Sequence, residues 1–165
     1  LVDTVADARA AGPDHDWQLD LAVLEPPADA TPEEAEDFLP EPPLVIGDEA
    51  RLRQVVVNLL ANARVHTPAG SHVTTTLARE GDTLIVRIHD DGPGIAPDVR
   101  DRLFERFARG DSSRERRTGS TGLGMSIALA IVQSHGGSID VDSSTAPEDH
   151  GTTFSIRLPA AVVEE

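Results

Sequence analysis

The sequence predicts a two-layer α/β sandwich in which helices cover one face of a mixed, mostly antiparallel sheet. Two segments, 49–66 and 123–135, place apolar residues at helical spacing. Several shorter segments alternate apolar and polar residues, as half-buried strands do. With 165 residues, of which 39% are hydrophobic, the chain can build one core and is short for two.

The first 43 residues divide into three parts. Residues 1–11 carry apolar side chains at helical spacing before a Gly-Pro stop, so we expect the end of a helix that continues upstream. Residues 17–21 alternate as a strand would. Residues 25–43 contain six prolines and many acids, and we expect a mobile surface insertion without regular structure.

A capped helix follows. Residues 44–46 form a short apolar run that we expect to be a strand, and Asp48 is placed to cap a helix from Glu49 to His66. The predicted core stripe of this helix comprises Leu52, Val55, Val56, Leu59, Leu60 and Ala63.

The rest of the chain predicts a hairpin, two helices and a final pair of strands. Residues 73–78 and 83–89 alternate around a central Glu-Gly-Asp turn. Residues 97–107 indicate a short helix, and the polar segment 106–122 is a candidate lid. The second long helix ends at a pair of glycines. Two strands should then follow, at residues 138–143 and 152–158.

Composition excludes several functions. The net charge of −15 argues against binding to nucleic acid. There is no cysteine, which excludes disulfides and thiolate metal sites and fits a reducing cytosol. All 14 basic residues are arginine, and a P-loop requires lysine, so any nucleotide would be bound by another architecture. No apolar run is long enough to cross a bilayer, so we expect this segment not to be inserted in a membrane.

Three patterns are candidates for chemistry. Asn58 and Asn62 project from one helical face, and amide oxygens suit Mg²⁺, although such a pair can also simply face solvent. Asp90 precedes Gly92 and Gly94; a carboxylate there could accept from an exocyclic amine, whereas the plainer interpretation is an ordinary turn. Gly119, Gly122 and Gly124 precede the second long helix. They could hold phosphates at the N-terminus of that helix, but glycine-rich turns are common.

Arginines concentrate in one segment. Five of them lie between Arg106 and Arg117, within the candidate lid. A solvated loop and an anion-facing loop both fit this charge pattern.

The order of these patterns resembles that of the N, G1, F and G2 boxes of sensor histidine kinases. The boxes correspond to Asn58-x-x-x-Asn62-Ala63, Asp90-x-Gly92-x-Gly94, Leu103-Phe104-Glu105-Arg106-Phe107 and Gly122-Leu123-Gly124. The resemblance extends from about residue 44 to residue 159. It implies the ATP-binding sandwich shared with gyrase, Hsp90 and MutL, called the Bergerat fold, with a mobile ATP lid over residues 106–122.

The resemblance also implies roles for individual residues. Asn62 would be the main Mg²⁺ ligand, and Asn58 a neighbouring contact to metal or phosphates; these two are the catalytic candidates. Asp90 would read adenine. The remaining predicted nucleotide contacts are Gly92 and Gly94 under the purine, Gly122, Leu123 and Gly124 over the phosphates, Arg106 and Arg109 from the lid, and His66 at ribose or phosphate.

Two positions depart from the family pattern. Family members usually have a basic residue three positions after the second asparagine, where this chain has Val65, and Arg64 should point elsewhere on the helix. His66 replaces a frequent tyrosine, and it could equally well cap the end of the helix.

The family's reaction is transfer of the ATP γ-phosphate to a histidine on a separate helical hairpin, and then to a response-regulator aspartate. None of the six histidines here is followed by the family's acceptor sequence. We therefore expect residues 1–11 to end an upstream dimerisation and phosphoacceptor segment, residues 12–160 to form the catalytic domain, and residues 161–165 to be a tail. The resemblance implies that this fragment is a monomer and lies in the cytoplasm. The intact protein would be a homodimer in the bacterial cell membrane.

Two other functions compete with this one. In a clamp ATPase of the gyrase or MutL kind, a glutamate four residues before the box asparagine activates water, whereas this chain has Asn58, which cannot act as a base. A non-catalytic nucleotide-sensing domain is the third possibility, and Val65 gives it some weight.

Overall fold

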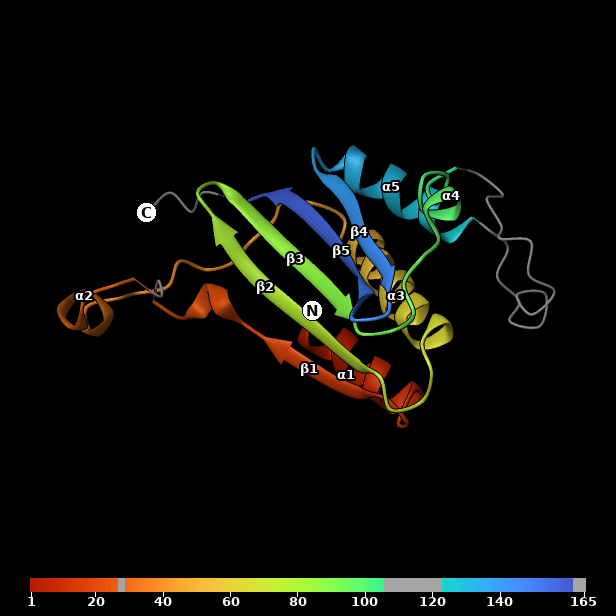
Figure 1. The fold of residues 1–165 in the computed structure, drawn as a ribbon. Coiled ribbons are helices and arrows are strands. Elements are labelled where there is room, and N and C mark those ends of the chain that lie inside the picture. The colour runs from red at the N-terminus through yellow and green to blue at the C-terminus, as the bar shows by residue number, and fades with distance from the viewer. Residues whose placement is uncertain (27–28, 106–122, 162–165) are drawn as a thin grey trace.

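The computed structural model describes residues 1–26, 29–105 and 123–161, which form one sheet with the longer helices on one of its faces (Figure 1). The helices are α1 (Val2–Ala11), α2 (Pro32–Glu36), α3 (Glu49–His66), α4 (Pro97–Arg100) and α5 (Gly124–Ser134), with a 3₁₀ turn η1 (Ala22–Leu24). The strands are β1 (Asp16–Asp20), β2 (His72–Glu80), β3 (Thr83–Asp90), β4 (Ser138–Ala146) and β5 (Asp149–Pro159).

The sheet has five strands in the order β1-β2-β3-β5-β4. Strand β1 pairs with β2 in parallel, and all other neighbours are antiparallel. The mixed, mostly antiparallel sheet predicted from the sequence is therefore confirmed.

The two faces of the sheet differ in polarity because successive side chains on a strand point to opposite faces. Along β3, Val86 and Ile88 face the helices, and their partners across β5 are Ile156 and Phe154. The opposite face carries polar side chains of these strands, namely Thr74, Thr76, Arg87, His89, Thr153 and Ser155. The apolar face packs against the helices and forms one side of the hydrophobic core.

Helices α1, α3 and α5 form the layer over that face (Figure 1). Four residues of the predicted stripe of α3 are buried: Val55, Leu59, Leu60 and Ala63. The other two, Leu52 and Val56, pack half-buried against the same cluster. From α5, Ala128 and Val132 are fully enclosed, which places α5 beside α3 in the core.

The start of α3 is fixed by two side chains. Asp48 accepts a hydrogen bond from the Arg51 N–H at 3.1 Å, as predicted for a cap. His135, at the end of α5, donates from Nδ1 to Ile131 O at 2.7 Å and accepts the Asp48 N–H at Nε2 at 3.0 Å. The end of α5 therefore holds the start of α3.

Three local predictions were wrong. Residues 44–46 are not a strand. Leu44 O accepts one hydrogen bond from Ala161 N, but the segment has no strand assignment and Ile46 is 84% exposed. Residues 32–36 form the short helix α2, because Thr31 and Glu34 complete a capping box. The helix expected at 97–107 ends at Arg100 and continues as turns to Phe104; the rest of that prediction lies outside the described residues.

Other elements agree with the predictions. Helix α1, helix α3 and the β2–β3 hairpin lie where the sequence placed them, although β2 also includes residues 72, 79 and 80, and β3 also includes residue 90. Strands β4 and β5 are both longer than predicted and meet in a tight turn. Across the ranges that the structure describes, we find no helix with the length and apolarity to span a membrane.

The cap at Asp48 can be tested by substitution. We expect Asp48→Ala to lower the free energy of unfolding by about 1 kcal/mol, because the first turn of α3 loses its side-chain acceptor. Urea unfolding measures this loss. Glu49→Ala at the same helix end is the control, and a loss as large as that of Asp48→Ala would contradict a specific role for the cap.

Candidate functional site

One end of the sheet carries a polar rung on its helix-covered face. Asp90, Thr152 and Ser143 are register partners across β3, β5 and β4. Asp90 is 6% exposed and Thr152 is 4% exposed. Because the side-chain period of a strand is two, Asp90 continues the apolar row of Val86 and Ile88, so the fold itself buries this carboxyl group.

Burial also governs the charge of Asp90. Loss of solvent around the carboxyl raises its pKa, and the Gly92 N–H, which donates to Oδ1 at 3.0 Å, opposes that shift. A carboxylate has about four lone-pair sites, so Asp90 retains capacity to accept from a ligand.

The segment after β3, Gly92 to Ile95, is held closely by its neighbours. Gly94 has φ +78°, and a Cβ there would overlap the carbonyl oxygen of Ser144, so only glycine fits. A Cβ on Gly92 would lie 2.8 Å from Asp90 Oδ1 and would overlap the Thr67 methyl group. The segment is therefore a smooth backbone floor beside Asp90, and we call it the floor loop.

Ser143 is a residue that sequence reasoning missed. Its Oγ accepts from Ile95 N at 2.8 Å and donates to Gly151 O at 2.9 Å. A hydroxyl has one proton, so Thr152 Oγ1, which lies 2.9 Å away, is the donor in its bond to Ser143. Ser143 thus connects the floor loop to the β4–β5 hairpin; no local sequence signal marks it, because its partners are distant in the chain.

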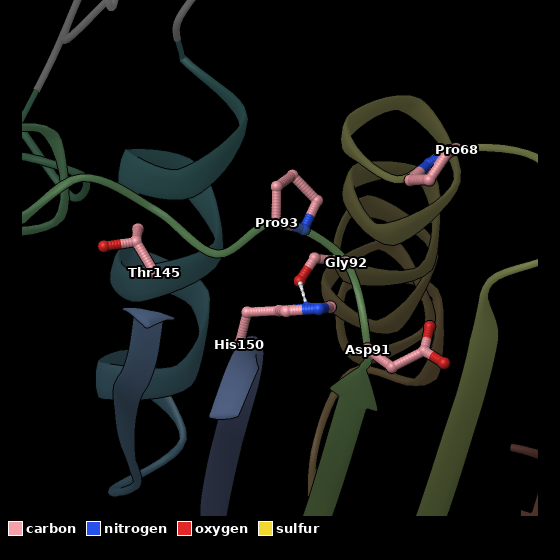
Figure 2. A pocket seen from close by; sticks show the side chains of 6 residues that line it. All are labelled: Pro68, Asp91, Gly92, Pro93, Thr145 and His150. Carbon is pink, nitrogen blue, oxygen red and sulfur yellow. Dashed lines mark hydrogen bonds between the residues drawn. The ribbon is translucent and has the colours of Figure 1, made fainter. Parts of the chain in front are cut away.

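His150 holds the same loop from the hairpin. Its Nδ1 donates to Gly92 O at 2.7 Å, and Figure 2 shows its ring pointing at that carbonyl group. A pocket of about 350 Å³ opens here, lined by Pro68, Asp91, Gly92, Pro93, Thr145 and His150. The carboxylate of Asp91 turns away from His150, toward His72, whose backbone N–H donates to it at 2.8 Å (Figure 2).

Asn58 and Asn62 face the beginning of α5, as the helical spacing predicted. Asn58 Nδ2 donates to Gly124 O at 3.4 Å, and Asn62 Nδ2 lies 3.9 Å from Met125 Sδ. Both amides are half-buried between the two helices. Their use of the amide nitrogens in these contacts leaves the oxygens as the atoms that could meet a cation.

The other predicted site residues are only partly placed. Leu123 is the N-cap of α5, and Gly124 is its first residue. His66 is exposed on the last turn of α3. Arg106, Arg109 and Gly122 lie outside the described residues, as does the predicted lid.

Val65, which replaces the usual basic residue, and its neighbour Arg64 both lie at the end of α3. Val65 is 41% exposed. Arg64 donates to Ala11 O at 3.5 Å, so its guanidinium group points toward α1, as expected. Among the described residues of α3, neither supplies a cation beside Asn62.

The described site therefore combines three features. Asp90 and the floor loop offer an acceptor beside a flat backbone surface, which suits a planar base with an exocyclic amine. The asparagine face of α3 offers neutral hard ligands. The start of α5 contacts the asparagine face, where Asn58 donates to Gly124 O.

Comparisons with known proteins identify the family to which this fold belongs. Residues 47–162 match a family model described as histidine kinase-, DNA gyrase B-, and HSP90-like ATPase. The probable sensor histidine kinase TcrY of Mycobacterium tuberculosis is 48% identical over 158 residues, which is 96% of this chain. The solved mycobacterial sensor histidine kinase MprB superposes with a TM-score of 0.76 at 30% identity, covering 96% of this chain and 92% of that one.

Full-length relatives are much longer. The chain spans 29% of the length of TcrY. The structure of full-length ShkA in complex with AMPPNP superposes with a TM-score of 0.70 at 25% identity, covering 99% of this chain and 30% of that one. The segment thus corresponds to one part of these proteins.

Asp90→Asn should not destabilise the fold at neutral pH. Because the folded-state pKa of Asp90 lies above its ordinary value of 3.8, the folded protein binds more protons between these two values, and stability falls as pH rises through that window. The ionised carboxylate therefore costs stability at pH 7, and the variant should be at least as stable there.

Thermal unfolding of both proteins from pH 3 to pH 8 measures this difference. The stability advantage of the variant should shrink as the pH falls from the raised folded-state pKa of Asp90 toward 3.8, and should then level off. A variant that is less stable at pH 7 and equally stable in acid would show that the burial of the charge has been misassigned.

Proposed function

Since the chain belongs to the family of histidine kinase-, DNA gyrase B- and HSP90-like ATPases, we propose that it transfers the ATP γ-phosphate to a histidine on a separate helical hairpin. Its fold is the Bergerat sandwich of that family, and it is the ATP-binding domain of a histidine kinase. The observation that carries the proposal is the buried Asp90, whose carboxyl group lies beside the floor loop and accepts from the Gly92 N–H.

The proposed base site consists of Asp90 and the floor loop. Adenine presents an amino group that a buried carboxylate can accept from, and Gly92 and Gly94 leave the face of the loop free of side chains. A bidentate or charged hydrogen bond in such a site discriminates strongly against bases that lack the donor. ShkA, in complex with AMPPNP, supports an adenine nucleotide as ligand.

The proposed phosphate site lies between α3 and α5. Asn62 is the proposed Mg²⁺ ligand, with Asn58 beside it. The described residues hold no cluster of three or more His, Asp or Glu side chains that could bind a metal ion by themselves. Amide oxygens alone fit a cation that takes its other ligands from phosphates and water, which is how Mg²⁺ is usually bound with nucleotides. When bound, the ion would neutralise charge on the phosphates.

Catalysis then depends mainly on position. A P–N bond forms at an imidazole nitrogen of the acceptor while the bond between the γ-phosphorus and its bridging oxygen breaks and ADP leaves. Phosphoryl transfer needs little covalent help from the protein, so the chain's part is to fix base and phosphates and to neutralise charge. Gly122, Leu123 and Gly124, with Arg106 and Arg109, are proposed phosphate contacts, and His66 a contact to ribose or phosphate.

The proposed partners follow from the same family. The acceptor hairpin belongs to the same protein, and the next acceptor is an aspartate of a response regulator. The intact protein is a homodimer in the bacterial cell membrane. This domain lies in the cytoplasm and is monomeric by itself. Relatives named sensor histidine kinases support this proposal. A clamp ATPase is disfavoured because Asn58 stands where that class needs a general base.

Phosphotransfer to a supplied hairpin tests the proposal. We expect γ-labelled ATP and Mg²⁺ to yield acid-labile, base-stable label on a histidine kinase hairpin. Asn62→Ala should slow this transfer at least about 10-fold, since even outer-sphere changes cost metal sites that much. Gln54→Ala, an exposed amide on the same helix, is the matched control.

Two outcomes would contradict the proposal. Phosphate released to water without label on the hairpin would favour a clamp ATPase. Neither release nor transfer, with ATP bound, would favour a nucleotide-sensing domain.

A further inference from the structure

We propose that His15 and Thr67 form a positioning pair that sets the distance between α3 and the floor loop, and so tunes nucleotide affinity. The proposal rests on the proposed function for its consequence, but its geometry stands independently of that function. His15 lies outside residues 47–162, the part of the chain that matches the family model.

Thr67 lies where the two halves of the site meet. It is the C-cap of α3, five residues after Asn62, and its extended backbone ends the helix. Its methyl group packs against the Cα of Gly92, so closely that a Cβ at Gly92 would overlap it. Its Oγ1 donates to Ala63 O at 2.7 Å, which ties the side chain back to the last turn of α3. Thr67 is therefore the wall between the asparagine helix and the floor loop.

His15 fixes the rotamer of Thr67. Its Nε2 lies 2.8 Å from Thr67 Oγ1 across 52 residues of sequence. The threonine hydroxyl has one proton, which goes to Ala63 O, so Oγ1 accepts and His15 Nε2 donates. A rotation of Thr67 about χ1 would break both bonds and would move the methyl group away from Gly92.

The surroundings of His15 hold its ring in place. The ring packs on Trp17, with centroids 5.8 Å apart, and the backbone N–H donates to Gly12 O at 3.2 Å. Trp17 is 3% exposed and also donates from Nε1 to Gly12 O at 2.7 Å. The turn between α1 and β1 is thus a rigid platform for His15.

The remaining nitrogen of His15 indicates which tautomer fits the site. His15 Nδ1 is buried and has no hydrogen-bond partner among the described residues. A proton on Nδ1 would be a buried donor without an acceptor, whereas the neutral Nε2–H tautomer leaves only an unused lone pair. The Nε2–H tautomer therefore fits both the bond to Thr67 and the buried Nδ1.

The pair has a consequence for the nucleotide. The base would rest on the floor loop and the phosphates near α3, so the separation of these two elements must match the ligand. Packing between them is close, and a shift at Thr67 is transmitted to Gly92 and to its hydrogen bond with Asp90. The pair acts through these groups and does not itself touch the ligand.

A double-mutant cycle tests the coupling. We expect His15→Leu and Thr67→Val each to weaken ATP binding about 5- to 10-fold by calorimetry, and the double variant to be no weaker than either single one. His15→Gln, whose amide nitrogen can take the place of Nε2, should restore most of the affinity. Thr153→Val is the matched control, because it breaks a His89–Thr153 bond of 2.9 Å on the opposite face of the sheet.

A second measurement needs no nucleotide. In the free protein, the ¹H–¹⁵N resonance of Gly92 should move in His15→Leu, return in His15→Gln and stay in place in Thr153→Val. An unmoved Gly92 resonance, or single losses of affinity that multiply in the double variant, would overturn the proposal. Wild-type protein that fails to bind ATP while Gly92 shifts as described would refute the proposed function and leave the positioning pair intact.

Discussion

The site depends on one constraint: the row of side chains that builds the core on β3 ends in a carboxyl group. Val86 and Ile88 face the helices, and strand periodicity forces Asp90 to the same side. A carboxylate buried there costs free energy, which the Gly92 N–H offsets only in part. A slip of one residue in register would send Asp90 to the polar face, so the register that forms the core also sets the position of the proposed adenine reader.

The elements around Asp90 are held by side chains from distant parts of the chain. Ser143 and His150 reach the floor loop from the β4–β5 hairpin, and Thr67 reaches it from α3. The backbone of that loop has little room to move, because Gly94 already lies against Ser144. A rigid floor suits a planar ligand, whose orientation would otherwise cost entropy on binding.

Local signals in the sequence predicted most of the fold and the candidate site. The Asp48 cap and the apolar stripe defined α3. The order of Asn58, Asn62, Asp90 and the glycines indicated the family and the candidate site, although each motif alone is common. The failures were local as well. Residues 44–46 are apolar enough for a strand but pair with no strand of the sheet. The capping box at Thr31 starts a short helix within a segment whose prolines and acids predicted a loop. Ser143 and His15 could not be predicted, because their partners lie far away in sequence and depend on the finished fold.

The most direct test of the central claim is calorimetric titration of ATP with Mg²⁺ into the wild-type chain and Asp90→Asn. If Asp90 reads adenine, wild-type protein should bind in the micromolar range, and the variant, with its fold intact, should bind at least about 10-fold more weakly, because a hydrogen bond to a charged acceptor is lost. Equal affinity of the two proteins would contradict the account and would place the base elsewhere on the domain.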